Sequence, residues 1–154
     1  MPSNLIIAKE TELPVGLEQL VQASVAEGLW FLQALRDQWN SGVDRFAKPG
    51  EALFAAHHGD SLAGVCGLNR DPHSADRAVG RLRRVFVGKP FRKQGVGRAL
   101  VFHALSFAGE HFSIIRVQTE TSEADFFYRA LGFSRVLSPL DATHELQLPG
   151  RPAA

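Results

Sequence analysis

The sequence of 154 residues contains one cysteine, Cys66, so no disulfide can form within the chain and a reducing compartment suits it. It has no apolar run long enough to cross a bilayer, and residues 1–4 carry none of the basic charge that begins a secretory signal. The net charge is only +1, which argues against a general nucleic-acid-binding protein. These shortages predict a cytoplasmic protein that embeds in no membrane and binds no nucleic acid.

Metal-binding patterns are also scarce. His57 and His58 are adjacent in an extended segment, so their side chains point to opposite faces and make poor joint ligands for a metal ion. Neither a cysteine nor an acidic cluster accompanies them, and we therefore predict no metal. Cys66 lies in an apolar segment and is expected to be a buried thiol rather than a nucleophile.

One stretch lacks acidic residues altogether. Residues 81–98 hold seven of the 17 Lys and Arg and no Asp or Glu, so the near-neutral total hides a local positive field. The seven are Arg81, Arg83, Arg84, Lys89, Arg92, Lys93 and Arg98. We interpret this stretch as part of a pocket for a polyphosphate, and the alternative is a solvated basic turn in front of an ordinary helix.

The same stretch has the order strand, glycine-containing loop, helix. Residues 82–87 are rich in β-branched and aromatic side chains, and the apolar residues of 100–108 recur at helical spacing. Gly95 and Gly97 lack a Cβ, so a ligand can approach their backbone, and the free N–H groups at a helix start favour an anion. Neither the P-loop pattern nor the third glycine of the dinucleotide fingerprint is present.

Apolar periodicity and turn residues divide the rest of the chain into strands and helices, with Gly59-Asp60 as the turn of a hairpin. The expected strands cover residues 5–8, 51–58, 61–68, 82–87, 113–119, 135–137 and 144–148. The expected helices cover residues 14–25, 30–39, 121–133 and the segment from the glycine loop to residue 108. This order predicts one mixed α/β domain over residues 1–148, with a disordered tail at 149–154.

Two motifs resemble those of a known family. Arg92-x-x-Gly95-x-Gly97 after a strand is similar to the signature of the GNAT acetyltransferase superfamily, and Ala124-x-x-x-Tyr128-x-x-x-Gly132-Phe133 resembles a second signature of that family. The element order over residues 5–148 is also similar. The resemblance implies a largely antiparallel central sheet of six to seven strands flanked by about four helices. It further implies transfer of an acetyl group from acetyl-coenzyme A to a primary amine by direct attack.

The resemblance also assigns residues to the donor. The loop amides would hold the diphosphate of acetyl-coenzyme A, and two basic side chains would add positive charge. Backbone groups at the end of the strand would pair with the pantetheine arm and place an N–H near the thioester oxygen. The amides are those of Gln94, Gly95, Val96, Gly97 and Arg98, the basic side chains are Arg92 and Lys93, and the strand residues are Phe86 and Val87. Thr121 stands where many members have an Asn that contacts the cofactor.

Tyr128 is the only tyrosine and occupies the family position of a general acid, whose phenol donates to the coenzyme A sulfur as the C–S bond breaks. The alternative is a core tyrosine that packs beside Phe126 and Phe127.

The acceptor side departs from the family. Many members carry a Glu on the strand that here holds Arg83 and Arg84, and strand alternation predicts that these two arginines face opposite sides of the sheet. The one on the acceptor side would pair with a substrate carboxylate, unless both are surface or ion-paired arginines. Glu51, His73 and Glu120 are the remaining candidates for a general base. Three aromatic residues fit either an acceptor pocket or the core: Trp30, Phe31 and Phe46.

The sequence does not identify the acceptor, which could be a small-molecule or a peptide amine, nor whether the acyl group is acetyl or longer. Because the strand lacks a Glu, a second hypothesis is a non-catalytic sensor of acyl-coenzyme A. A third is a nucleotide-binding protein unrelated to coenzyme A. A homodimer is compatible with the sequence but not required by it.

Overall fold

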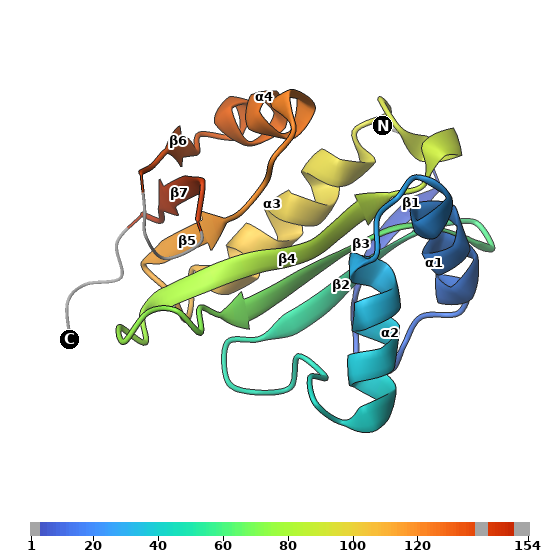
Figure 1. Ribbon diagram of the computed structural model, residues 1–154, viewed down its shortest axis with the longest axis horizontal. Helices are drawn as coiled ribbons and strands as arrows, with labels where there is room; N and C mark the ends of the chain where they lie inside the picture. The colour runs from blue at the N-terminus through green and yellow to red at the C-terminus, as the bar shows by residue number, and fades with distance from the viewer. Residues whose placement is uncertain (1–3, 138–141, 150–154) are drawn as a thin grey trace.

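A seven-stranded sheet runs through the molecule in the order β1-β2-β3-β4-β5-β7-β6 (Figure 1). The structure is a computed structural model and describes residues 4–137 and 142–149. Neighbouring strands are antiparallel except β4 and β5, which are parallel. The strands are β1 (Leu5–Glu10), β2 (Ala52–His58), β3 (Ser61–Arg70), β4 (Val79–Val87), β5 (Ile114–Val117), β6 (Ser134–Arg135) and β7 (His144–Gln147).

Helices cover both faces of the sheet (Figure 1). On one face, α1 (Leu17–Ala26) and α2 (Phe31–Ser41) bury a core with residues of β2 and β3 and with Phe86 of β4. On the other face, α3 (Val96–Ala108) and α4 (Ser122–Ala130) bury a second and larger core. A 3₁₀ turn, η1 (Lys89–Phe91), connects β4 to the loop in front of α3.

The mixed α/β fold, the element order and the largely antiparallel sheet are confirmed. The predicted hairpin is present, because His58 pairs with Ser61 across Gly59-Asp60. Boundaries differ by a few residues: β4 begins at Val79 rather than 82, and the strand expected at 135–137 is the two-residue β6. Most of the predicted tail, residues 150–154, lies outside the described residues.

A β-bulge reverses the faces of β4 in its second half. Leu82 packs into the core under α3, whereas Phe86, four residues later, packs into the core under α1 and α2. In a regular strand these two residues would share a face, because side chains alternate. The register against β3 shifts between Val65 and Gly67, and Arg84 takes a left-handed φ of 60°. One extra residue in β4 is therefore absorbed at Arg84.

Gly67 lies opposite the bulge and admits the ring of Phe46. A Cβ at residue 67 would lie 2.6 Å from Phe46 Cε1 and 2.9 Å from the carbonyl oxygen of Arg83. Phe46 is buried in the core with α1 and α2. The closeness of this contact explains why the position holds glycine, and it assigns Phe46 to the core rather than to an acceptor pocket.

We expect Gly67→Ala to lower the free energy of unfolding by about 1–3 kcal/mol, because the methyl group overpacks both a ring and a backbone carbonyl. Urea unfolding followed by circular dichroism measures it. The matched control is Gly109→Ala at the end of α3, where φ is −60°. A Cβ there would lie 3.7 Å from the nearest atoms, the carbonyl oxygens of Leu105 and Ser106, so stability should change little. A Gly67→Ala protein as stable as the control would contradict the packing account.

Candidate active site

The loop between η1 and α3 presents unpaired backbone donors. Gly95, with a left-handed φ of 84°, caps α3, and Lys93 is also left-handed at 62°. Arg92 N–H bonds to Lys89 and Ala99 N–H bonds to Gly95, but in the described structure no backbone partner is recorded for the N–H groups of residues 93–98. The first turn of α3 holds no acidic residue. The predicted amides of Gln94–Arg98 thus form an electropositive cradle at a helix start.

Arg92 lies beside this cradle, but its guanidinium is held by the protein. Its two terminal nitrogens contact the Glu27 carboxylate at the end of α1, both at 2.8 Å. Its Nε donates to the carbonyl oxygen of Val87 at 2.9 Å, and the group lies over the Phe86 ring. Arg92 lowers the pKa of Glu27, chiefly through the hydrogen bond. Lys93, in contrast, is exposed on the loop.

A gap opens between the two parallel strands. β4 pairs with β5 only from Val79 to Arg81, so residues 82–87 have no ladder partner on that side, while Phe86 and Val87 still pair with β3. The gap holds a cavity of about 310 Å³, which we call the inter-strand pocket. It is lined by residues 81–85 of β4, residues 117–119 at the end of β5, Phe31 of α2, and Ala124 and Tyr128 of α4.

Tyr128 lines this pocket and also packs in the core. Its side chain is 5% exposed, and its ring contacts those of Phe127, Phe133 and His144. Burial raises the pKa of the phenol above its ordinary value, with a smaller contribution from Cys66. Tyr128 therefore packs in the core, as the packing alternative predicts, and it also borders the pocket, while its role as a general acid stays a prediction. Cys66 is fully buried, as expected, and burial raises the pKa of its thiol to about 12.

Two contacts fix α4, which carries Tyr128. Thr121 caps the helix, since its Oγ1 accepts from the N–H of Ala124 at 3.1 Å. Asp125 Oδ1 lies 2.7 Å from Nε2 of the buried His144 on β7, whose Nδ1 lies 2.8 Å from Thr143 Oγ1. The hydrogen bond with His144 is the main reason that the pKa of Asp125 is lowered. Thr121 therefore acts as a helix cap in this structure.

The expectation that Arg83 and Arg84 face opposite sides of the sheet is wrong. Arg83 Nη1 lies 3.8 Å from Asp44 Oδ2, and Arg84 Nη2 donates to Gln38 Oε1 of α2 at 3.2 Å. Both side chains therefore lie on the α2 side. The bulge is the physical reason, because the left-handed residue 84 breaks the alternation that the prediction assumed.

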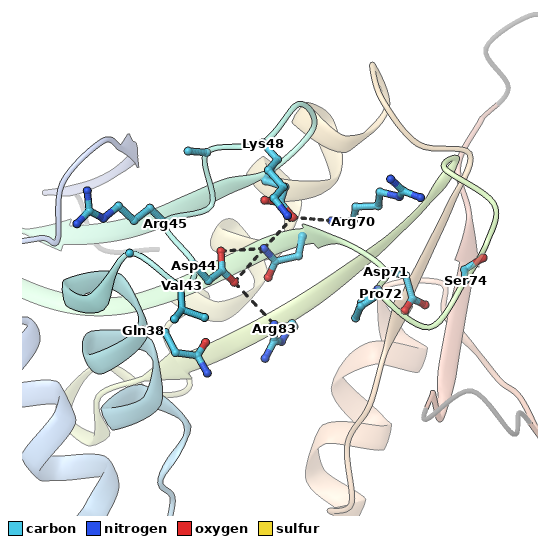
Figure 2. Close-up of a pocket in the computed structure, with 14 residues that line it drawn as sticks. Gln38, Val43, Asp44, Arg45, Lys48, Arg70, Asp71, Pro72, Ser74 and Arg83 are labelled. Atoms are coloured by element: carbon cyan, nitrogen blue, oxygen red, sulfur yellow. Dashed lines mark hydrogen bonds and ion pairs between the residues drawn. The ribbon is translucent and has the colours of Figure 1, made fainter.

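A second cavity, of about 690 Å³, adjoins the first at Arg83 (Figure 2). This polar pocket is lined by residues of the 42–48 and 69–74 segments with Gln38, Glu51 and Arg83. Asn69 donates to Asp44 Oδ2 at 3.3 Å and to Glu51 Oε2 at 3.0 Å. Glu51, 8% exposed, also accepts from the N–H of Arg70. The network joins two carboxylates, one amide and Arg83 on the floor of the pocket.

Comparison with known proteins decides the family. Residues 18–133 match the Acetyltransferase (GNAT) family. The chain belongs to the GNAT acetyltransferase family. The fold is similar to that of a provisionally assigned acetyltransferase from Exiguobacterium sp. 255-15, with a TM-score of 0.81, 25% identity and 93% of each chain covered.

Two other solved structures resemble the chain in fold at lower identity. One is yncA from Salmonella typhimurium with its cofactor acetyl-CoA, at 13% identity, a TM-score of 0.71 and 98% of each chain covered. The other is YhbS from Escherichia coli in complex with CoA, at 16% identity and a TM-score of 0.69, covering 95% of this chain and 82% of that one. At these identities the likeness shows the fold alone.

A curated relative is the protein ML0378 of Mycobacterium leprae (strain TN), 32% identical over 81 residues. The match covers 53% of this chain and 22% of the relative, so the chain spans only about a fifth of that protein's length.

Of the remaining candidates of this GNAT chain, Phe31 alone lines the inter-strand pocket. Trp30 is 62% exposed and lines neither cavity, whereas Phe31 lines the inter-strand pocket and packs on Phe86. His73 and Glu120 line neither cavity, and Glu51 belongs to the polar pocket. Among residues 4–137 and 142–149 no group of three or more potential metal ligands is found, and no helix is long and apolar enough to span a membrane.

We expect the Glu27–Arg92 pair to be visible in titration. Because the folded pKa of Glu27 is lowered, the pair stabilises the fold above the unfolded value of about 4.3 and loses that effect as pH falls through the folded pKa. NMR titration of the Glu27 carboxyl in the Arg92→Met variant should return its pKa towards the ordinary value. Arg98→Met, a change in the first turn of α3 without an ion pair to Glu27 in the described structure, is the control. An unchanged Glu27 pKa in Arg92→Met would refute the assignment.

Proposed function

We propose that the protein transfers an acetyl group from acetyl-coenzyme A to a primary amine, as an N-acetyltransferase that acts by direct attack. The observation that carries the proposal is the alignment of three features along β4. The unpaired amides of residues 94–98 lie beyond the C-terminal end of β4. The edge of residues 82–87 is not paired with β5, and Tyr128 lines the pocket in the gap between these two strands. These residues fit a long donor with an anionic diphosphate at one end and a reactive thioester at the other.

The cradle would bind the donor. The free N–H groups of residues 94–98 and the helix dipole attract the diphosphate, and exposed Lys93 and Arg98 add charge. Arg92 contributes by position, since its bonds to Glu27 and Val87 hold the loop against α1 and β4. Residues 82–87 are not paired with β5, so their backbone groups on that edge are free to bond to the amides of the pantetheine arm.

The bound thioester supplies an activated carbonyl carbon, and this chain supplies the surroundings of the transfer. A backbone N–H near Phe86 or Val87 would stabilise the negative charge that develops on the thioester oxygen. The amine nitrogen forms the new C–N bond as the C–S bond breaks. Tyr128 gives its proton to the leaving sulfur and regains one from solvent, and its raised pKa keeps the phenol protonated at neutral pH.

The acceptor amine must lose a proton, and the described lining of the inter-strand pocket contains no carboxylate or histidine. Three guanidinium groups line it instead: Arg81, Arg83 and Arg84. Positive charge in the pocket lining lowers the pKa of a bound ammonium group and so favours the neutral amine that can attack. We infer that the proton leaves through water rather than through a protein base.

The missing carboxylate also supports the second candidate, a sensor that binds acyl-coenzyme A without turnover. Thiol release on addition of amines separates the two, since a sensor binds the donor and releases no thiol at any pH. The single buried thiol of Cys66 suits the cytoplasmic setting that we propose for either function.

We expect Tyr128→Phe to lower kcat by about 100-fold or more, because the leaving sulfur loses its proton donor. The dissociation constant of acetyl-coenzyme A should stay within about twofold, since the ring is kept. Phe133→Leu, which disturbs the packing of the Tyr128 ring but keeps the phenol, is the matched control. A kcat for Tyr128→Phe equal to that of the wild type would leave this tyrosine a purely structural role.

We expect acetyl-coenzyme A to raise Tm by about 5–10 °C at about 100 times its dissociation constant, whereas ATP and NAD leave Tm unchanged. In Arg98→Glu the shift should largely vanish, because an acidic side chain beside the cradle repels the diphosphate. Arg77→Glu, on the exposed loop after β3, should keep the full shift. A larger shift with ATP or NAD would favour the nucleotide-binding alternative.

A further inference from the structure

Of the three arginines of the inter-strand pocket, one has a carboxylate partner among the described residues. Arg83 lies 3.8 Å from Asp44, which Asn69 holds in place, and Arg81 Nη2 donates to Gln118 Oε1 at 3.3 Å. Arg84 donates to the neutral oxygen of Gln38 and makes no ion pair with any residue in the described part of the chain. One carboxylate in ion-pair range thus serves three guanidinium groups.

Arg84 is therefore a half-buried cation without an ion-pair partner among the described residues, and Arg81 also lacks one there, but its hydrogen bond lies at the exposed surface. Burial lowers the pKa of Arg84 to about 10, and repulsion from Arg83 and Arg81 adds to this, while Asp44, outside ion-pair range, opposes the shift only in part, so the group is still charged at neutral pH. A cation taken out of water is normally paired, because desolvation is costly. Its backbone is also left-handed, a conformation that non-glycine residues adopt at a cost. Two unfavourable features at one residue that lines a pocket indicate a role in binding.

The position of Arg84 defines what it can bind. It lines the same pocket as Tyr128, so a group that contacts it lies close to the place of acyl transfer. The diphosphate of the donor would lie at the amides of residues 93–98, beyond the other end of the free strand edge. The anion for Arg84 must then come from the acceptor.

The geometry points to an acceptor that carries a carboxylate close to its reactive amine, with the carboxylate bound by the guanidinium of Arg84. This inference rests on the proposed amine acetylation and specifies its substrate class. A guanidinium matches a carboxylate through two parallel N–H bonds, and the bound anion would supply the missing counter-ion. Arg83 is the paired neighbour that Asp44 holds, and Arg84 is the specificity-determining residue.

The test compares amines that differ only in charge: glycine, β-alanine and γ-aminobutyrate, each against its amide. The wild type should acetylate the best carboxylate with a kcat/KM about tenfold or more above that of its amide. In Arg84→Met this preference should fall to near one, mainly through KM, and Arg84→Lys should retain part of it. Arg36→Met removes a surface arginine of α2 that pairs with Glu18 and should leave the preference unchanged.

Two results would overturn the inference while amine acetylation stands: equal rates for acids and amides in the wild type, or an unaltered preference in Arg84→Met. Replacing β-alanine by O-phosphoethanolamine distinguishes the anion, and a preference for the phosphate would refute a carboxylate.

A binding experiment keeps the inference testable without turnover. Glutarate, which has carboxylates and no amine, should bind to the wild type in the presence of coenzyme A and bind at least about tenfold more weakly to Arg84→Met in calorimetry. Equal affinities would overturn the role of Arg84. Absence of thiol release with every amine would instead refute the proposed function and leave this comparison intact.

Discussion

The early end of the pairing between β4 and β5 is the constraint on which the rest of the site depends. Three residue pairs hold the two parallel strands together, and beyond Arg81 each strand follows a different course. The bulge at Arg84 contributes, because an extra residue increases the local twist and bends the strand. The same bulge moves Arg84 to the side of α2 and leaves Val85 and Val87 facing α3. One irregularity thus contributes to the gap, and it also determines on which side of the sheet Arg84 lies.

Side-chain networks hold the surroundings of this gap from both faces of the sheet. On the α2 side, Asn69 bridges Asp44 and Glu51 and so restrains the carboxylate that faces Arg83. On the α3 side, the pair of Asp125 and His144 ties α4 to β7. Glu27 and Arg92 link α1 to the loop before α3. Each contact joins elements distant in sequence, so the positions of the pocket residues follow from the tertiary fold and not from local preference.

How much could be predicted from the sequence depended on how local each signal was. Short continuous segments determine three features: the hairpin at Gly59-Asp60, the glycine loop before α3 and the helix that carries Tyr128. The sequence predicted the positions of all three. The faces of Arg83 and Arg84 were not, since nothing in Leu82–Val87 marks the extra residue of a bulge. Asp44, Asn69 and Glu27 were missed because their roles come from partners up to 65 residues away. The sequence predicted that the positive charge of Arg92 binds the diphosphate of the donor. It could not reveal that the Arg92 guanidinium already pairs with the Glu27 carboxylate.

The free edge of β4 also has a length. Six residues of β4, Leu82 to Val87, follow the last residue paired with β5, and at about 3.3 Å per residue they span roughly 20 Å. One end of this segment is fixed by the ladder to β5 and the other by the cradle in front of α3. A donor that binds as we propose would lie along this edge, from the cradle towards the inter-strand pocket, so the length of the free edge sets how much of its arm the strand can pair with.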